Sequence, residues 1–76
     1  MSIVEYGKKN CMKCKMTKKW LTNHNIQFKY IDIEEDEESF NMLKDKGYKS
    51  LPVVFKDGEF FFSGFDVKKL ETLLKE

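Results

Sequence analysis

The chain has 76 residues, 41% of them hydrophobic, which is enough for the core of one small domain over residues 1–76 and argues against disorder. The formal net charge of +1 predicts no attraction to nucleic acid or to a membrane surface, and no apolar stretch is long enough to span a bilayer. No basic segment followed by an apolar run marks a signal peptide, so we expect a cytoplasmic protein.

The first predicted unit is a strand followed by a helix. The apolar run Ile3–Tyr6 is typical of a buried strand, and Gly7 begins the turn after it. Beyond the turn, residues that could face a core recur at helical spacing: Cys14, Thr17, Trp20, Leu21 and His24. Residues 23–25, Asn-His-Asn, are typical of a helix end.

A second strand and a second helix follow. Residues 28–33 alternate with a period of two, which predicts a strand and, with the preceding elements, a parallel strand–helix–strand unit. Acidic residues 34–38 precede the apolar residues of a short segment that ends in lysines and Gly47, a charge order that suits a helix. The acidic run is interpreted as a solvated helix face rather than a docking surface.

A hairpin and a last helix complete the chain. Residues 51–55 and 59–62 are rich in strand-forming residues and are separated by a turn at Asp57-Gly58. The three successive phenylalanines at 60–62 cannot all face one side of a strand, so an exposed one would mark a contact surface unless helices cover both faces. Asp66 can cap a final helix, for which we expect an apolar stripe of Val67, Leu70, Leu73 and Leu74.

The two cysteines, Cys11 and Cys14, are three positions apart at the junction between the first strand and the first helix. In this context the spacing is typical of a dithiol redox site. The start of a helix and nearby lysines would lower the pKa of Cys11 and favour its thiolate, the nucleophilic form. A bridge closing so short a ring constrains little chain entropy, which favours chemistry over a stabilising role.

Two other interpretations of the pair stay open from the residues alone. The cysteines could be two ordinary buried thiols, or they could bind a metal or an iron–sulfur cluster. His24 is the remaining candidate zinc ligand, but along a continuous helix it would lie roughly 20 Å from Cys11. Structural zinc usually takes four ligands, and no second cysteine pair exists. A metal or cluster bridged between two chains is the surviving form of this alternative.

Three motifs in this order resemble the thioredoxin superfamily, and in particular its short members, the glutaredoxins and NrdH-redoxins. They are residues 11–14 (Cys-Met-Lys-Cys), 50–54 (Ser-Leu-Pro-Val-Val) and 62–65 (Phe-Ser-Gly-Phe). The resemblance covers essentially the whole chain. It implies an α/β, thioredoxin-like fold of order β-α-β-α-β-β-α, with a four-stranded mixed sheet flanked by three helices.

The resemblance also implies roles for individual residues. Cys11 would be the attacking thiol and Cys14 the resolving thiol. Pro52 would be a cis-proline facing the dithiol, and the Leu51 backbone would pair with the partner chain. The residues implied in partner or substrate binding are Lys8, Met12, Lys13, Ser50, Leu51, Pro52, Ser63, Gly64, Phe65 and Asp66. Phe62 stands where NrdH-redoxins have a tryptophan before Ser-Gly-Phe, and Asp66-Val67-Lys68 stands where they have Arg-Pro-Asp after it.

The glutathione site of a typical glutaredoxin is only partly matched. Lys8, Ser50 and Asp66 occupy matching places, whereas Lys13 stands where those proteins have a tyrosine and Val67 replaces a second acid. The resemblance therefore implies an electron carrier with protein-disulfide reductase activity, reduced by thioredoxin reductase and donating to a ribonucleotide reductase. We expect a monomer without a tightly bound cofactor. The alternative is a glutathione-dependent glutaredoxin.

Six lysines surround the cysteine pair, and they allow two interpretations. They are Lys8, Lys9, Lys13, Lys15, Lys18 and Lys19. They could form a solvated helix face, or the first three could tune Cys11 and contact an acidic partner.

Overall fold

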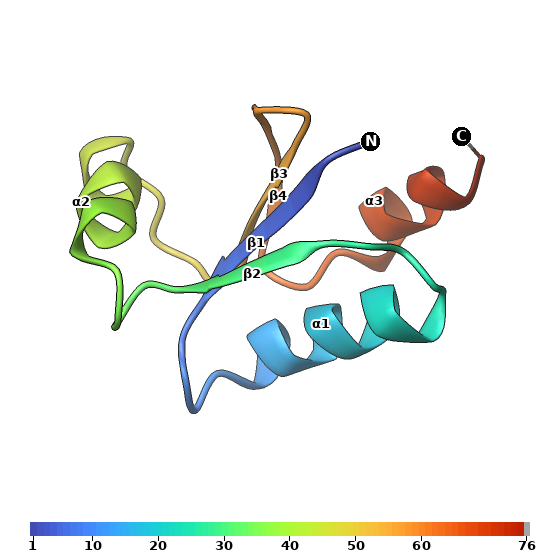
Figure 1. Ribbon diagram of the computed structural model, residues 1–76, viewed down its shortest axis with the longest axis horizontal. Helices are drawn as coiled ribbons and strands as arrows, with labels where there is room; N and C mark the ends of the chain where they lie inside the picture. The colour runs from blue at the N-terminus through green and yellow to red at the C-terminus, as the bar shows by residue number, and fades with distance from the viewer. Residues whose placement is uncertain (76) are drawn as a thin grey trace.

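The computed structural model describes residues 1–75 and confirms the predicted element order (Figure 1). The elements are β1 (Ile3–Gly7), α1 (Met12–Asn23), β2 (Lys29–Asp32), α2 (Glu37–Asp45), β3 (Val53–Lys56), β4 (Glu59–Ser63) and α3 (Val67–Thr72), which a 3₁₀ turn (Leu73–Lys75) extends. Among these described residues, no helix combines the length and the apolar character needed to cross a bilayer.

The four strands form one mixed sheet in the order β2-β1-β3-β4. β1 pairs with β2 in parallel, and the pairs β1–β3 and β3–β4 are antiparallel. The parallel pair is joined through α1, as the strand–helix–strand pattern predicts. In Figure 1, α1 and α3 lie on one side of the sheet and α2 lies on the other.

The main core lies between the sheet and the two helices α1 and α3. Its buried members are Ile3, Leu21, Val54, Phe62, Leu70 and Leu73. Trp20 packs against this cluster while partly buried. Because alternate β1 residues are buried, the strand presents positions 3, 5 and 7 to this core.

The turns are formed by residues suited to them. Asp57 and Gly58 both have positive φ, at 52° and 84°, the backbone that matches a two-residue hairpin to the twist of its strands. Gly47 (φ 79°) follows α2 in the same left-handed region. The Asp66 carboxylate accepts a hydrogen bond from the Lys69 amide at 3.1 Å, which confirms the predicted cap of α3.

Two residues of the apolar stripe expected on α3 are exposed instead, and His24 is at the end of α1, one of the two places expected for it. His24 lies at the C-cap of α1, where its ring stacks on Trp20 with centroids 3.8 Å apart rather than entering the core. Val67 is the first residue of α3, and Leu74 lies in the 3₁₀ turn, whose tighter winding rotates it away from the core; both are exposed. Only Leu70 and Leu73 of that stripe are buried.

The three phenylalanines of β4 divide between environments. Phe62 is buried, but Phe60 is 47% exposed and stacks on Tyr48 at 4.9 Å between ring centroids. A register shift pairs Val54 with Phe62 and Phe55 with Phe60, so Phe61 is the extra residue of a bulge. Helices on both sides of the sheet therefore do not cover all three rings.

Glu5 is a carboxylic acid in the middle of the core. Its side chain is 0% exposed, and within residues 1–75 neither carboxyl oxygen has a hydrogen-bond partner. Burial raises the pKa of Glu5 to about 8, against a weaker opposing effect of the Lys18 charge. The sequence suggested only an apolar strand here, so this buried acid is a finding of the structure.

Replacing Glu5 by leucine should stabilise the protein in a pH-dependent way. The carboxyl ionises near pH 4.5 in the unfolded chain and near pH 8 in the folded one, so folding takes up a proton between these values. The unfavourable contribution of Glu5 to the free energy of unfolding thus grows as pH rises from 4.5, and it reaches its full size above pH 8. For Glu5→Leu we expect the free energy of unfolding to increase by about 3 kcal/mol at pH 7 but by less than about 1 kcal/mol at pH 5.

Urea unfolding of the variant and the wild type at both pH values measures this difference. Glu59→Gln, at an exposed position of β4, is the control and should change stability little at either pH. A gain from Glu5→Leu that is equal at pH 5 and pH 7 would contradict the raised pKa.

Candidate functional site

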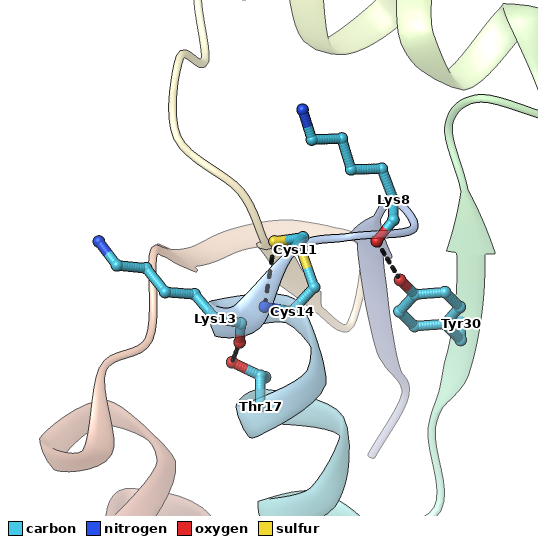
Figure 2. Close-up of a disulfide and its surroundings, with 6 residues drawn as sticks. All are labelled: Lys8, Cys11, Lys13, Cys14, Thr17 and Tyr30. Atoms are coloured by element: carbon cyan, nitrogen blue, oxygen red, sulfur yellow. Dashed lines mark hydrogen bonds between the residues drawn. A yellow bond between two sulfur atoms is a disulfide. The ribbon is translucent and has the colours of Figure 1, made fainter.

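Cys11 and Cys14 form a disulfide at the start of α1, with their Cα atoms 5.2 Å apart (Figure 2). Cys11 is the N-cap of the helix and has an extended backbone (φ −119°). Its sulfur accepts a hydrogen bond from the Cys14 amide at 3.2 Å. The Cys14 amide belongs to the first helical turn, whose amides have no partners within the helix, so negative charge on this sulfur is favoured.

The two sulfurs differ in their access to solvent. Cys14 is 0% exposed, whereas Cys11 is partly exposed and the intervening Met12 is 71% exposed. A thiol or disulfide from another molecule can therefore reach Cys11 and not Cys14. This asymmetry fits the expected division between an attacking and a resolving cysteine.

Gly7 gives Cys14 the room to lie against the sheet. A Cβ atom at position 7 would be 3.0 Å from the Cys14 sulfur and 2.6 Å from the Tyr30 hydroxyl oxygen. Any larger residue would therefore displace one of these groups. The Tyr30 hydroxyl also lies 3.5 Å from the Lys8 carbonyl oxygen, at the loop that leads into Cys11 (Figure 2).

An open groove of about 350 Å³ runs beside Cys11. It is lined by Lys8, Asn10, Cys11, Met12, Lys13, Lys49 and Leu51. The structure thus brings together two distant parts of the chain, the cysteine loop and the segment that precedes β3. Asn10 and Lys49 were not predicted. Asn10, with a left-handed φ of 58°, is the last residue of the loop before Cys11. Lys49 is distant in sequence and reaches the groove only because its segment packs beside the cysteine loop.

The peptide bond between Leu51 and Pro52 is cis, as the resemblance implies. Pro52 is buried, and its carbonyl oxygen accepts a hydrogen bond from the Gly64 amide at 2.9 Å. This bond fastens the turn at residues 63–64 to the segment that lines the groove. Gly64, with φ 74°, adopts the left-handed backbone that this turn requires.

The remaining predicted binding residues do not line the groove. Ser50 and Ser63 are exposed next to segments of the site. Phe65 is partly buried and packs against the main core. The Asp66 carboxylate is engaged in capping α3. The structure therefore separates the predicted set into residues at the groove and residues that support or adjoin it.

A second, larger cavity of about 690 Å³ adjoins the groove. Its lining residues are Lys8, Ile33, Glu34, Phe40, Leu43, Lys44, Gly47, Tyr48, Lys49 and Leu51. Lys8, Lys49 and Leu51 belong to both hollows, so one continuous surface leads from Cys11 to α2. A bound polypeptide could extend along it.

The lysines around the cysteines have separate environments. Lys9 forms an ion pair with Glu35 at 3.2 Å, and the ammonium group of Lys18 lies 4.2 Å from the centroid of the Tyr30 ring. Lys8 and Lys13 extend on either side of the disulfide in Figure 2 and line the groove, as does Lys49. The groove therefore has a positive rim. Lys9 does not contribute to it, because it forms its solvent-exposed ion pair with Glu35, in the segment that precedes α2.

The part of the chain that the structure describes contains no cluster of side chains that could bind a metal ion. Within residues 1–75, no three His, Cys, Asp or Glu side chains come together in a potential metal site. His24, the third ligand weighed from the sequence, lies at the opposite end of α1 from Cys11.

Comparisons with known proteins agree on one family. The sequence model of the glutaredoxin family matches residues 3–61. A glutaredoxin-like protein NrdH from Lactococcus lactis is 44% identical over 93% of this chain and 97% of its own length. The glutaredoxin-like protein NrdH of Escherichia coli K12 is 32% identical over 86% of this chain and 79% of its own.

Solved structures give the same picture. The NrdH-redoxin of Escherichia coli superposes with a TM-score of 0.89 at 29% identity, covering 96% of this chain and 95% of that one. A glutaredoxin from Archaeoglobus fulgidus superposes with a TM-score of 0.76 at 29% identity, covering 97% and 86%. The thioredoxin-like fold is thus shared with an NrdH-redoxin and a glutaredoxin, and the spacing of Cys11 and Cys14 in this chain supports a dithiol oxidoreductase.

Proposed function

The chain belongs to the glutaredoxin family, with NrdH proteins among its relatives, and from this premise we propose that it carries electrons from thioredoxin reductase to a ribonucleotide reductase. The general activity, thiol–disulfide exchange by a Cys11/Cys14 dithiol, follows from the family and the cysteine spacing. The observation that supports the site best is the asymmetry of the pair, in which a partly exposed Cys11 caps a helix and a buried Cys14 lies behind it.

The reaction proceeds in two exchanges. The Cys11 thiolate attacks one sulfur of the partner's disulfide; a bond forms between Cys11 and the partner, and the partner's other sulfur leaves as a thiolate. The Cys14 thiol then loses its proton and attacks the Cys11 sulfur, which releases the partner's second sulfur. The partner gains two electrons and two protons, and the protein is left with the Cys11–Cys14 disulfide.

Three observations favour thioredoxin reductase as the reductant. Lys13 occupies the place of the tyrosine found in glutathione-using glutaredoxins, and the Asp66 carboxylate is already engaged as the cap of α3. The related NrdH-redoxin from Escherichia coli is described as having a thioredoxin-like activity profile. Glutathione is the second candidate reductant, because Lys8 and Leu51 line the same groove as Cys11.

The proposal is tested by reconstituting the complete electron chain. NADPH, thioredoxin reductase, this protein and a ribonucleotide reductase that contains its active-site disulfide are combined with a ribonucleotide. We expect deoxyribonucleotide to form only when all the proteins are present. Failure of this protein to support product, with an enzyme that does turn over with dithiothreitol, would refute the proposed partner.

The positive rim of the groove should contribute to recognition of an acidic partner. Lys13→Glu combined with Lys49→Glu is expected to raise the reductase KM about 5-fold at low salt, with the effect shrinking as salt screens the charges. Lys68→Glu combined with Lys75→Glu is the matched control, because it also reverses two charges but does so away from the groove. The same KM for all proteins at low salt would show that these lysines form only a solvated surface.

A further inference from the structure

We propose that Glu5 is the proton acceptor of the second exchange: its buried carboxylate takes up the proton that Cys14 releases on attacking Cys11. This inference rests on the dithiol mechanism given above. Glu5 is unusual because, in the part of the chain that the structure describes, this acid lies in the main core without a hydrogen-bond partner. Unpaired buried carboxyls are costly, and apolar residues would serve packing better at this position.

The backbone places Glu5 beneath the disulfide. Glu5 and Gly7 point to the same face of β1, since both are buried in the alternating pattern of that strand. The Cys14 sulfur lies against Gly7 on this face, 3.0 Å from the point where a Cβ would be. Glu5 is therefore one side-chain position along the sheet from the site where Cys14 packs.

Tyr30 and Lys18 complete the polar surroundings of Glu5. Tyr30 is the register partner of Glu5 on β2. Its hydroxyl oxygen would lie only 2.6 Å from a Cβ atom at position 7. The hydroxyl and the Cys14 sulfur thus lie next to the same point. The ammonium group of Lys18, on α1, lies 4.2 Å from the centroid of the Tyr30 ring.

The charged and titratable groups facing Glu5 are therefore few. They are Lys18 and Cys14 from α1 and Tyr30 from β2. On the β3 side its register partner is Val54, which is apolar, and the buried residues of α3 and its 3₁₀ extension are leucines. The charge of Lys18 lowers the pKa of Glu5 and so favours its ionised carboxylate. Burial and, to a smaller extent, the charge of Glu5 raise the pKa of Tyr30, so that its hydroxyl stays protonated.

The proposed step is balanced. The S–H bond of Cys14 breaks as its sulfur bonds to Cys11, and the proton moves to the Glu5 carboxylate. The bond between Cys11 and the partner breaks, and the partner's sulfur leaves as a thiolate. Glu5 then returns its proton to solvent, from which the partner thiolate is protonated. The step needs no additional oxidant or reductant.

Rapid mixing of the reduced protein with an aromatic disulfide that releases a coloured thiolate separates the two exchanges. The first release depends on reagent concentration and reports the attack by Cys11. The second is intramolecular, does not depend on reagent concentration, and reports the attack by Cys14. For Glu5→Gln we expect the second rate to fall about tenfold at pH 8, because a well-placed general base contributes at least that much. The first rate should stay within twofold.

The pH dependence distinguishes a proton acceptor from a packing residue. Because Glu5 ionises near pH 8 in the folded protein, the ratio of wild-type to Glu5→Gln second rates should increase between pH 6.5 and pH 8.5. Glu5→Asp keeps a carboxylate and should restore part of the rate and the pH dependence. Glu5→Leu, which we expect to be more stable than the wild type, should lower the second rate as Glu5→Gln does. If the glutamine variant is unfolded, the second rate of the leucine variant tests the role of the carboxylate.

Two results would overturn the inference, and they are distinguishable. Second rates that are equal in wild type, Glu5→Gln and Glu5→Leu at every pH would remove the role of Glu5 and leave the dithiol mechanism intact. A wild-type protein that shows only the first release would lack a resolving cysteine and would refute the mechanism itself. Glu59→Gln is the matched control, because it neutralises an exposed glutamate on β4 and should alter neither rate.

Discussion

Cys11→Ser should abolish disulfide reduction, with turnover falling at least about 10³-fold. Cys11 has the only accessible sulfur of the pair, since Cys14 is fully buried behind it. A serine hydroxyl is not ionised near neutral pH. The variant therefore has no anionic nucleophile for the helix N-terminus to stabilise. The substitution removes one sulfur and leaves the backbone cap position filled, so the fold should persist.

NADPH consumption in the presence of thioredoxin reductase and a protein disulfide measures the effect. Met16→Ser is the control, because Met16 is exposed on α1 outside the groove and its replacement should leave turnover within twofold. Circular dichroism of both variants establishes that they are folded. Normal turnover by a folded Cys11→Ser protein would refute the assignment of Cys11 as the attacking thiol.

Cys14→Ser should stop the reaction at its midpoint. Cys11 can still attack a partner disulfide, but no thiol lies behind it to resolve the mixed disulfide, so the covalent complex accumulates. We expect multiple turnover with a protein disulfide to fall at least about 10²-fold, while the first attack keeps its rate within a fewfold. Non-reducing electrophoresis and intact mass measurement should show one partner molecule bound through Cys11 and released by dithiothreitol.

The double variant Cys11→Ser/Cys14→Ser is the matched control and should form no covalent complex. A Cys14→Ser protein that turns over like the wild type would mean that an external thiol resolves the intermediate. In that case the buried position of Cys14 would have no role in exchange with protein disulfides.

The order of the elements was predictable because each has a clear local pattern. Residues 28–33 alternate, and β2 (Lys29–Asp32) forms within them. Asp57-Gly58 separates two strand-forming runs, and the hairpin turns there. Asp66 precedes an apolar stripe and caps α3. These signals lie within a few residues of each other and need no knowledge of the tertiary fold.

The groove was only partly predictable, because it joins segments that are far apart in sequence. The cysteine spacing identified Cys11 and Cys14, and the resemblance identified Leu51 and the cis-proline that follows it. Lys49 gave no local signal, and only the packing of its segment beside the cysteine loop brings it to the groove.

The environment of the charged residues was the least predictable feature. Glu5 was only one residue of a strand interpreted as apolar, and nothing local indicated that both of its oxygens would be buried without a hydrogen-bond partner among the described residues. Lys9 appeared to belong with the lysines near Cys11, but it pairs with Glu35 instead. Such outcomes depend on which side chains the sheet and helices bring together, information that periodicity does not contain.

The most direct test of the proposed electron path compares two reductant systems with one disulfide substrate. One reaction contains NADPH and thioredoxin reductase, and the other contains NADPH, glutathione and glutathione reductase. NADPH consumption that depends on this protein is measured in each. The account predicts fast turnover with thioredoxin reductase and little with glutathione. Fast turnover in the glutathione reaction alone would contradict it and would identify the protein as a glutathione-dependent glutaredoxin.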